Sequence, residues 1–160
     1  MAESGLTLKE GDPAPPFTAR TNGAGTVSLA DLRGKNVVLF FYPKDNTPGC
    51  TVEACGIRDN YEELKKEGAV VLGVSTDSVK SHDKFVEKFK LPYTLLADDD
   101  KKIVEAYGVW GPKKFMGVKY TGTTRATFLI GPDGRIRKIW PKVKPLGHAA
   151  EILAALREKS

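Results

Sequence analysis

The sequence predicts an α/β fold with a central mixed β-sheet flanked by helices. Hydrophobic runs typical of buried strands, at 36–42 and 69–76, alternate with segments of helical periodicity, and this order is typical of parallel strands joined by helices. Two later strand-like segments, 124–130 and 135–140, flank a Gly-Pro-Asp-Gly sequence at 131–134. That turn signal predicts an antiparallel hairpin, so the sheet is expected to contain both strand orientations.

The composition fits one globular domain, and we expect residues 1–160 to form it. The apolar fraction of 41% and the charged fraction of 28% argue against a disordered or fibrous chain. No stretch approaches the roughly 18 apolar residues of a membrane span, and the N-terminal segment lacks the regions of a signal peptide. We therefore expect a cytoplasmic protein without a membrane partner.

The net charge of +5 raises the question of an acidic partner. Most lysines alternate with acidic residues, as in 62–67, which is typical of a solvated helix face and argues against nucleic-acid binding. Only 113–119 and 135–144 are locally basic. These two segments leave open either docking of an acidic protein or a simple contribution to solubility.

The segments before the first buried strand are short or irregular. Residues 1–16 are interrupted by glycine and prolines, which predicts an irregular arm. Segments 17–21 and 26–28 flank Asn-Gly-Ala-Gly at 22–25 and predict a small N-terminal hairpin extension. Residues 28–32 are expected to form a short turn.

Two amphipathic helices are expected in the middle of the chain. The first spans 47–67 and ends at Gly68, with one apolar face formed by Ala54, Ile57, Tyr61 and Leu64. The second follows the capping pair Asp77-Ser78 and ends before Pro92, with one face formed by His82, Phe85, Val86 and Phe89.

The C-terminal half continues this alternation. A short strand is expected at 93–97, and Asp98-Asp99-Asp100 reads as the capped start of a helix that runs to Tyr107. Residues 109–122 are rich in glycine and lysine and are expected to form a loop. After the hairpin comes a last helix, whose apolar face is formed by Ala149, Ile152, Leu153 and Leu156.

Both cysteines lie in the stretch 43–55, which the rest of the chain is expected to support. Pro43 ends a buried strand because proline cannot donate to a sheet. Thr47-Pro48 has the order of an N-cap and a first helical residue, which places Cys50 in the first turn of a helix. The helix dipole and the unpaired N–H groups favour a thiolate there. Composition alone allows two inert buried thiols equally well, and the helix-start position favours a reactive Cys50.

The spacing of the cysteines restricts a disulfide between them. In a regular helix the Cα atoms of Cys50 and Cys55 lie about 8.5 Å apart, whereas a disulfide requires roughly 4.4 to 6.8 Å. Formation of this bond therefore requires the first turns to unwind. Gly56 weakens the helix at this point by about 1 kcal/mol relative to alanine.

The pattern Pro43-x-x-x-Thr47-x-x-Cys50 resembles the peroxidatic motif of the peroxiredoxins. The second cysteine, five residues later, resembles the peroxiredoxin Q or bacterioferritin comigratory protein subgroup. The resemblance extends over nearly the whole chain, from 11–15 through 75–78 to 125–130. It implies a thioredoxin-like fold and a thiol-dependent peroxidase that reduces hydrogen peroxide and organic hydroperoxides.

The resemblance also implies a role for individual residues. It identifies Cys50 as the peroxidatic cysteine, Cys55 as the resolving cysteine, Thr47 and Pro43 as motif partners, and Arg125 as the arginine that holds thiolate and peroxide. Glu53, one turn beyond Cys50, could orient the guanidinium. Without the resemblance, Arg125 at a strand start would more often be a solvated arginine.

The resemblance further implies that no metal or organic cofactor is needed. The reductant is expected to be thioredoxin or a glutaredoxin-like dithiol protein. Because both cysteines lie in one chain, catalysis does not require a dimer, and a monomer is expected. The preferred peroxide depends on the shape of a pocket that the sequence does not define.

The residues alone also allow three other functions for the two cysteines. A thioredoxin-type disulfide oxidoreductase normally uses C-x-x-C, whereas four residues separate the cysteines here. A redox-switch protein would form the disulfide without turnover. A metal site could combine Cys50 and Cys55 with His82 or His148, but no pair has a zinc-like spacing.

Overall fold

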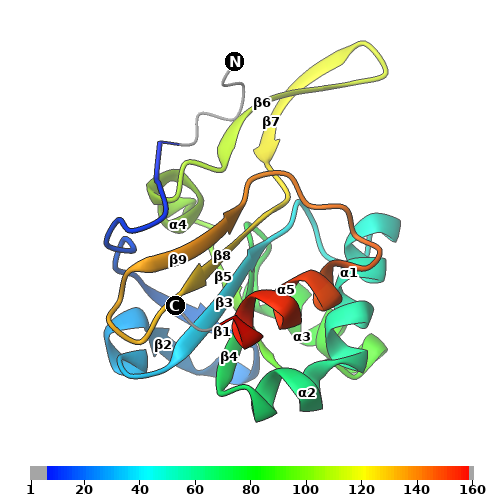
Figure 1. The fold of residues 1–160 in the computed structure, drawn as a ribbon. Coiled ribbons are helices and arrows are strands. Elements are labelled where there is room, and N and C mark those ends of the chain that lie inside the picture. The colour runs from blue at the N-terminus through cyan, green and yellow to red at the C-terminus, as the bar shows by residue number, and fades with distance from the viewer. Residues whose placement is uncertain (1–6, 159–160) are drawn as a thin grey trace.

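The computed structural model describes residues 7–158, and its centre is a seven-stranded mixed sheet (Figure 1). The strand order is β2-β1-β5-β4-β3-β8-β9, with β3, β4 and β5 parallel and the outer strands antiparallel to their neighbours. The strands are β1 (Thr18–Thr21), β2 (Thr26–Ser28), β3 (Asn36–Phe41), β4 (Ala69–Ser75), β5 (Thr94–Ala97), β8 (Ala126–Ile130) and β9 (Ile136–Trp140). The predicted mixed sheet and the N-terminal hairpin are confirmed.

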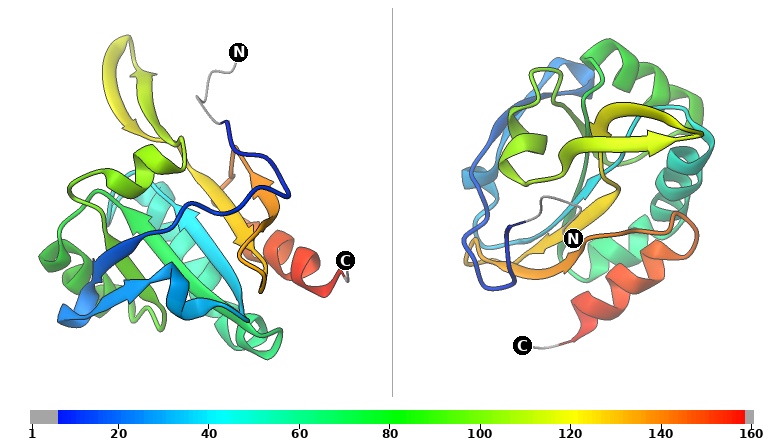
Figure 2. Two further views of the ribbon diagram at one scale, coloured as in Figure 1. Left: turned by 90° about the vertical axis from the view of Figure 1, so that its left-hand side faces the viewer. Right: turned by 90° about the horizontal axis from the view of Figure 1, so that it is seen from above.

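Helices cover both faces of this sheet (Figure 2). Along β3, Val38 and Phe40 point to one face and Leu39 and Phe41 to the other, as the period of two in a strand requires. The first face is covered by α1 (Pro48–Asp59), α2 (Tyr61–Lys66), α3 (Val79–Phe89) and α5 (His148–Arg157). The second is covered by α4 (Lys102–Ala106) and part of the N-terminal arm.

The described part of the N-terminal arm, residues 7–16, has no strand of its own, in agreement with the expectation, but it is held against the hairpin of β8 and β9. The backbone N–H of Gly11 donates to the carbonyl of Ile136, and that of Ala14 donates to the carbonyl of Gly134. Residues 1–6 of the predicted arm lie outside the described residues. Among the described helices, none combines the length and apolar character that crossing a bilayer would need.

The expected loop at 109–122 is wrong. The chain forms a two-stranded antiparallel hairpin of β6 (Trp110–Phe115) and β7 (Val118–Thr123), which projects from the body of the molecule (Figures 1 and 2). The strands are joined at Met116 and Gly117, and both have a positive φ, as a tight hairpin turn requires. The Gly and Lys content of the segment concealed this pairing.

The single helix expected at 47–67 is also wrong, because the chain forms two helices that meet at Asn60. The backbone of Asn60 leaves the helical conformation, with φ −110° and ψ 11°, and its side-chain amide donates to the carbonyl of Gly56 at 2.8 Å. Asparagine commonly competes with helical hydrogen bonding in this way. The apolar periodicity continues across the break, so it could not reveal it.

The two other short elements agree with the expectations. Residues 29–32 form one turn of 3₁₀ helix. The Asp98 carboxylate accepts hydrogen bonds from the backbone N–H groups of Ile103 and Val104, at 3.0 and 2.8 Å, so it caps the start of α4. At the carboxyl end of the parallel strands, the loop 43–47 leaves β3 and leads into α1.

Candidate active site

Cys50 is the third residue of α1 and is buried, with 2% of its surface exposed. Thr47 precedes the helix with an extended backbone (φ −92°, ψ 156°), and Pro48 is the first helical residue, as predicted. The sulfur therefore lies at the positive end of the helix dipole, in contact with the core.

Thr47 occupies the N-cap position without a side-chain capping bond. Its hydroxyl instead donates to the backbone carbonyl of Lys44 at 2.9 Å. Because the hydroxyl proton is used in this way, the lone pairs of Oγ1 are left as acceptors. Pro43 lies at the exposed start of the same loop.

Arg125 lies against the first turns of α1. It precedes β8, and because Ala126 pairs with Phe41, the start of β8 lies beside the end of β3. Its Nη1 donates to Oε1 of Glu53 at 2.8 Å. Burial lowers the pKa of Arg125, but its hydrogen bond to the Glu53 carboxylate and the negative charge of Cys50 outweigh this effect and raise the pKa. The predicted group of Cys50, Glu53 and Arg125 is thus brought together.

Glu53 is a buried carboxyl, with 1% of its surface exposed. Burial raises the pKa of Glu53 to about 7, although the hydrogen bond and charge of Arg125 act in the opposite direction. Within the described residues, its second oxygen, Oε2, is buried without a hydrogen-bond partner. Near neutral pH the carboxyl therefore compensates the guanidinium charge only in part, which leaves positive charge available beside Cys50.

Cys55 is half-buried on the same helix, and both thiols are free. Helix α1 runs without a break from Pro48 to Asp59, so the two cysteines keep the separation of a regular helix. The pKa of Arg58 is raised mainly by its hydrogen bond to Asp59, and that of Tyr93 mainly by burial. Both groups lie close enough to Cys55 for the charge of its sulfur to raise these pKa values further. The structure does not bring Cys55 into bonding contact with Cys50.

A family model matches most of the chain. Residues 10–139 match the model of the AhpC/TSA family. The chain belongs to the AhpC/TSA family.

Relatives and solved structures narrow the assignment to one group of peroxiredoxins. The chain is 52% identical over 151 residues to a Coxiella burnetii protein that bears the name peroxiredoxin bcp, covering 94% of this chain and 100% of that relative. It is 48% identical over 155 residues to peroxiredoxin Bcp of Bacillus subtilis, covering 97% and 99%. A cysteine-to-serine variant of Xylella fastidiosa PrxQ superposes with a TM-score of 0.90 at 38% identity, covering 96% and 98%.

These likenesses agree with the geometry of the site. The chain has the thioredoxin-like fold of the peroxiredoxins, and it is a thiol-dependent peroxidase. Its substrate is a peroxide, and its turnover requires a thiol reductant.

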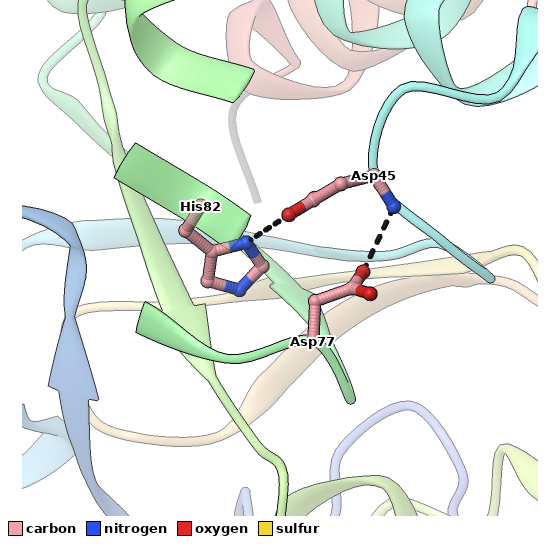
Figure 3. Close-up of side chains that lie close together, drawn as sticks. All are labelled: Asp45, Asp77 and His82. Atoms are coloured by element: carbon pink, nitrogen blue, oxygen red, sulfur yellow. Dashed lines mark hydrogen bonds and ion pairs between the residues drawn. The ribbon is translucent and has the colours of Figure 1, made fainter. Parts of the chain in front are cut away.

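One cluster beside the site was not recognised in the sequence (Figure 3). Within the described part of the chain, ligand atoms of Asp45, Asp77 and His82 lie within 4.8 Å of one another, which is close enough for a metal ion. Both ring nitrogens of His82 and the facing carboxylate oxygens already hold hydrogen bonds, so a cation would have to displace them. The sequence placed His82 on an apolar helix face and considered it as a metal ligand only together with the cysteines, and no contact of Asp45 was predicted.

A glycine in the first turn of α1 gives a direct test of the arginine position. A Cβ added at Gly49 would lie 3.1 Å from Nη2 of Arg125, so Gly49→Ala should displace the guanidinium. We expect the rate of Cys50 oxidation by peroxide to fall by about tenfold or more. The measurement is single-turnover oxidation by stopped flow.

The control for this variant is Gly56→Ala, because nothing lies within 4 Å of a Cβ at that position of the same helix. Its oxidation rate should match that of the unmodified peroxiredoxin. An undiminished rate in Gly49→Ala would show that the guanidinium position does not matter for peroxide reaction.

The buried carboxyl predicts a pH dependence of stability. Because the pKa of Glu53 is raised in the folded state, the folded protein binds this proton more tightly than the unfolded chain. The associated stability is present below the unfolded pKa, near 4.5, and is lost as the pH rises through about 7. Relative to Glu53→Gln, the free energy of unfolding should therefore fall over this range, by up to about 3 kcal/mol.

Urea unfolding of both proteins across this pH range measures the difference. Glu62→Gln on α2 is the control, because the Glu62 carboxylate is largely exposed, at 80%. Its stability should follow that of the unmodified protein at every pH. Parallel curves for Glu53→Gln and the unmodified protein would contradict the prediction.

Proposed function

We propose that Cys50 is the peroxidatic cysteine of this peroxidase and that Cys55 resolves it. The observation that supports this most is the placement of the Cys50 sulfur in the first turn of α1, beside a guanidinium that Glu53 holds at 2.8 Å. A helix N-terminus and a fixed positive charge together stabilise a thiolate more than either does alone. Cys50 is then a nucleophile at neutral pH.

In the first step, the Cys50 thiolate attacks one peroxide oxygen and the O–O bond breaks. The sulfur becomes a sulfenic acid, and the other oxygen leaves and is protonated to water or an alcohol. Arg125 stabilises the negative charge that develops on the leaving oxygen. The hydroxyl of Thr47 is free to accept a hydrogen bond from the peroxide O–H, because its own proton is donated to Lys44.

In the second step, the thiolate of Cys55 attacks the sulfenic sulfur, the S–O bond breaks, and the hydroxide that leaves is protonated to water as the disulfide forms. In α1 the two Cα atoms are about 8.5 Å apart, which exceeds the roughly 4.4 to 6.8 Å of a disulfide. The first turns of α1 must therefore unwind before the bond can form. An external dithiol then reduces the disulfide by thiol–disulfide exchange.

The proposal also covers the reductant and the peroxides that this protein uses. We expect thioredoxin, or a glutaredoxin-like protein, to supply the dithiol. Xanthomonas campestris bacterioferritin comigratory protein, whose solved structure concerns alkyl peroxide reduction, is 38% identical with a TM-score of 0.86 and covers 95% of this chain and 97% of that chain. This supports organic hydroperoxides, beside hydrogen peroxide, as substrates.

The cycle supports four further expectations. Both cysteines lie in one chain, so a monomer should complete the cycle without a residue from a partner. Every step uses protein side chains alone, so no metal or organic cofactor is required. A reducing compartment such as the cytoplasm would keep both thiols available between turnovers. Pro43 is expected to border the site without adding an N–H donor.

Replacement of each cysteine tests the assignment. Cys50→Ser should reduce peroxide consumption to the background rate, because the attacking sulfur is gone. Cys55→Ser should complete one turnover and then stop, because no disulfide forms for the dithiol to reduce. The measurement is NADPH oxidation in an assay coupled to thioredoxin and its reductase, together with mass spectrometry of the oxidised proteins.

The two variants control each other, since each removes one thiol from the same helix. Addition of a small thiol should restore turnover in Cys55→Ser and leave Cys50→Ser inactive. Steady-state peroxide consumption by Cys50→Ser at the unmodified rate would refute the assignment.

The unwinding step predicts a measurable coupling between helix stability and redox state. Oxidation should lower the helix content seen by circular dichroism. Gly56→Ala should stabilise α1 by about 1 kcal/mol, which would favour the reduced form and make the reduction potential more positive by about 20 mV. The potential is measured by equilibration with glutathione buffers.

Gly111→Ala in β6 is a matched control, because it also adds a methyl group where nothing lies within 4 Å. Its potential should equal that of the unmodified protein. Identical spectra for the reduced protein and for a protein with a proven Cys50–Cys55 disulfide would contradict the unwinding step.

A further inference from the structure

The loop 43–47 carries two residues of the proposed site, Pro43 and Thr47, yet it has no regular structure of its own. Asn46 within it has a positive φ of 61°, a conformation that asparagine tolerates but that most residues avoid. The position of Thr47 therefore depends on what the loop is attached to. Asp45, two residues from both Pro43 and Thr47, provides that attachment.

The attachment begins with a buried histidine on α3 (Figure 3). Nδ1 of His82 lies 2.7 Å from Oδ2 of Asp45, and Nε2 lies 2.8 Å from the carbonyl oxygen of Leu96. A carbonyl only accepts, so Nε2 carries a proton, and a carboxylate likewise requires a proton on Nδ1. The ring is therefore an imidazolium, paired with Asp45 in the protein interior.

The environment of the ring agrees with this protonation state. His82 has no exposed surface. Burial lowers the pKa of His82, but the hydrogen bond and charge of Asp45, the carbonyl of Leu96 and the charge of Asp77 together raise it.

Asp45 is fixed through both its side chain and its backbone. Oδ1 accepts from the hydroxyl of Tyr42 at 2.6 Å, and Oδ2 accepts from the hydroxyl of Ser81 at 2.8 Å as well as from His82. The backbone N–H of Asp45 donates to Oδ2 of Asp77 at 2.8 Å. Asp45 is thereby joined to Tyr42 at the end of β3, to α3, and to Asp77 in the segment between β4 and α3.

A buried ion pair of this kind adds little net stability compared with apolar residues, because both charges lose their hydration. The pair instead specifies one conformation of the loop, because its hydrogen bonds are satisfied in that conformation. The pair has no hydrogen bond to Cys50 or Arg125 among the described residues, so any effect on the reaction must pass through the loop.

We propose that Asp45 and His82 are a positioning pair for the peroxidase reaction: they hold the loop 43–47 so that Thr47 meets the peroxide bound at Cys50. This inference rests on the proposed role of Cys50. It assigns the pair to the attack on peroxide, because the later capture by Cys55 needs the first turns of α1 to unwind, which ends the fixed arrangement of Thr47 and Cys50.

The test compares two reactions of the same sulfur in a Cys55→Ser background. Oxidation of Cys50 by hydrogen peroxide needs the positioned loop, whereas alkylation of Cys50 by iodoacetamide needs only an accessible thiolate. In Asp45→Asn and His82→Gln, the peroxide rate should fall by between about 10-fold and 100-fold. The alkylation rate should stay within about twofold of the parent, since the thiolate itself is unchanged.

Asp98→Asn is the matched control. Asp98 is also a buried carboxylate, and it accepts two backbone hydrogen bonds at the start of α4. The same substitution there should lower stability while leaving the ratio of peroxide rate to alkylation rate at the parent value. A loss of stability alone is thus separated from a loss of positioning.

Milder variants keep the test decisive if the two substitutions prevent folding. Ser81→Ala and Tyr42→Phe each remove one hydroxyl donor to Asp45 and leave the ion pair, and each should lower the same ratio by a smaller factor. A ratio equal to the parent in every folded variant would overturn the positioning pair, and so would an equal fall in both rates. Absence of a sulfenic acid in the Cys55→Ser parent would instead refute the role of Cys50, and the inference would fall with it.

Discussion

Helix α1 imposes the constraint on which the chemistry of this protein depends. The hydrogen-bonded turns that place Cys50 at the positive end of the helix also hold Cys55 out of reach of it. A reactive thiolate and a ready disulfide are therefore incompatible in one conformation of this segment. The protein must carry out the two steps of the proposed cycle in two states of the same helix.

Two buried acids, Glu53 on this helix and Asp45 in the loop before it, act in different ways. Glu53 makes one hydrogen bond to Arg125 and has a second oxygen without a partner among the described residues, and burial raises its pKa to about 7. Asp45 instead accepts hydrogen bonds from three side chains, those of Tyr42, Ser81 and His82. The first arrangement leaves the guanidinium charge partly uncompensated beside the sulfur, and the second fixes a loop.

The sequence predicted those features that depend on local pattern. The buried strands at 36–42 and 69–76 follow from continuous apolar runs, and the place of Cys50 follows from Thr47-Pro48. The position of Arg125 beside Cys50 is a long-range contact, and only the family resemblance could supply it. The contact of Asp45 with His82 spans 37 residues and was not predicted, because a histidine on an apolar helix face reads as core. The helix break at Asn60 was not predicted, because the apolar periodicity of the sequence continues across it.

The contacts of α1 explain which end of the helix can open. Its C-terminal part is held by Ile57 in the core, by the hydroxyl of Tyr93 on the carbonyl of Ala54 at 2.6 Å, and by Arg58 on the carbonyl of Phe89 at 2.7 Å. A helix of 12 residues has little stability of its own, so such contacts decide where it persists. The N-terminal turns are held by the packing of Cys50 in the core and by the hydrogen bond from Arg125 to Glu53.

In the proposed cycle, oxidation of Cys50 changes that balance at the N-terminal end. A sulfenic acid has lost the negative charge of the thiolate, so the attraction between the sulfur and Arg125 weakens as soon as the peroxide is reduced. The interaction that favours the first reaction is thereby removed by its product. Helix α1 is then held mainly at Ile57 and Arg58, and the turns that carry Cys50 and Cys55, up to Gly56, become the least costly part of the helix to release.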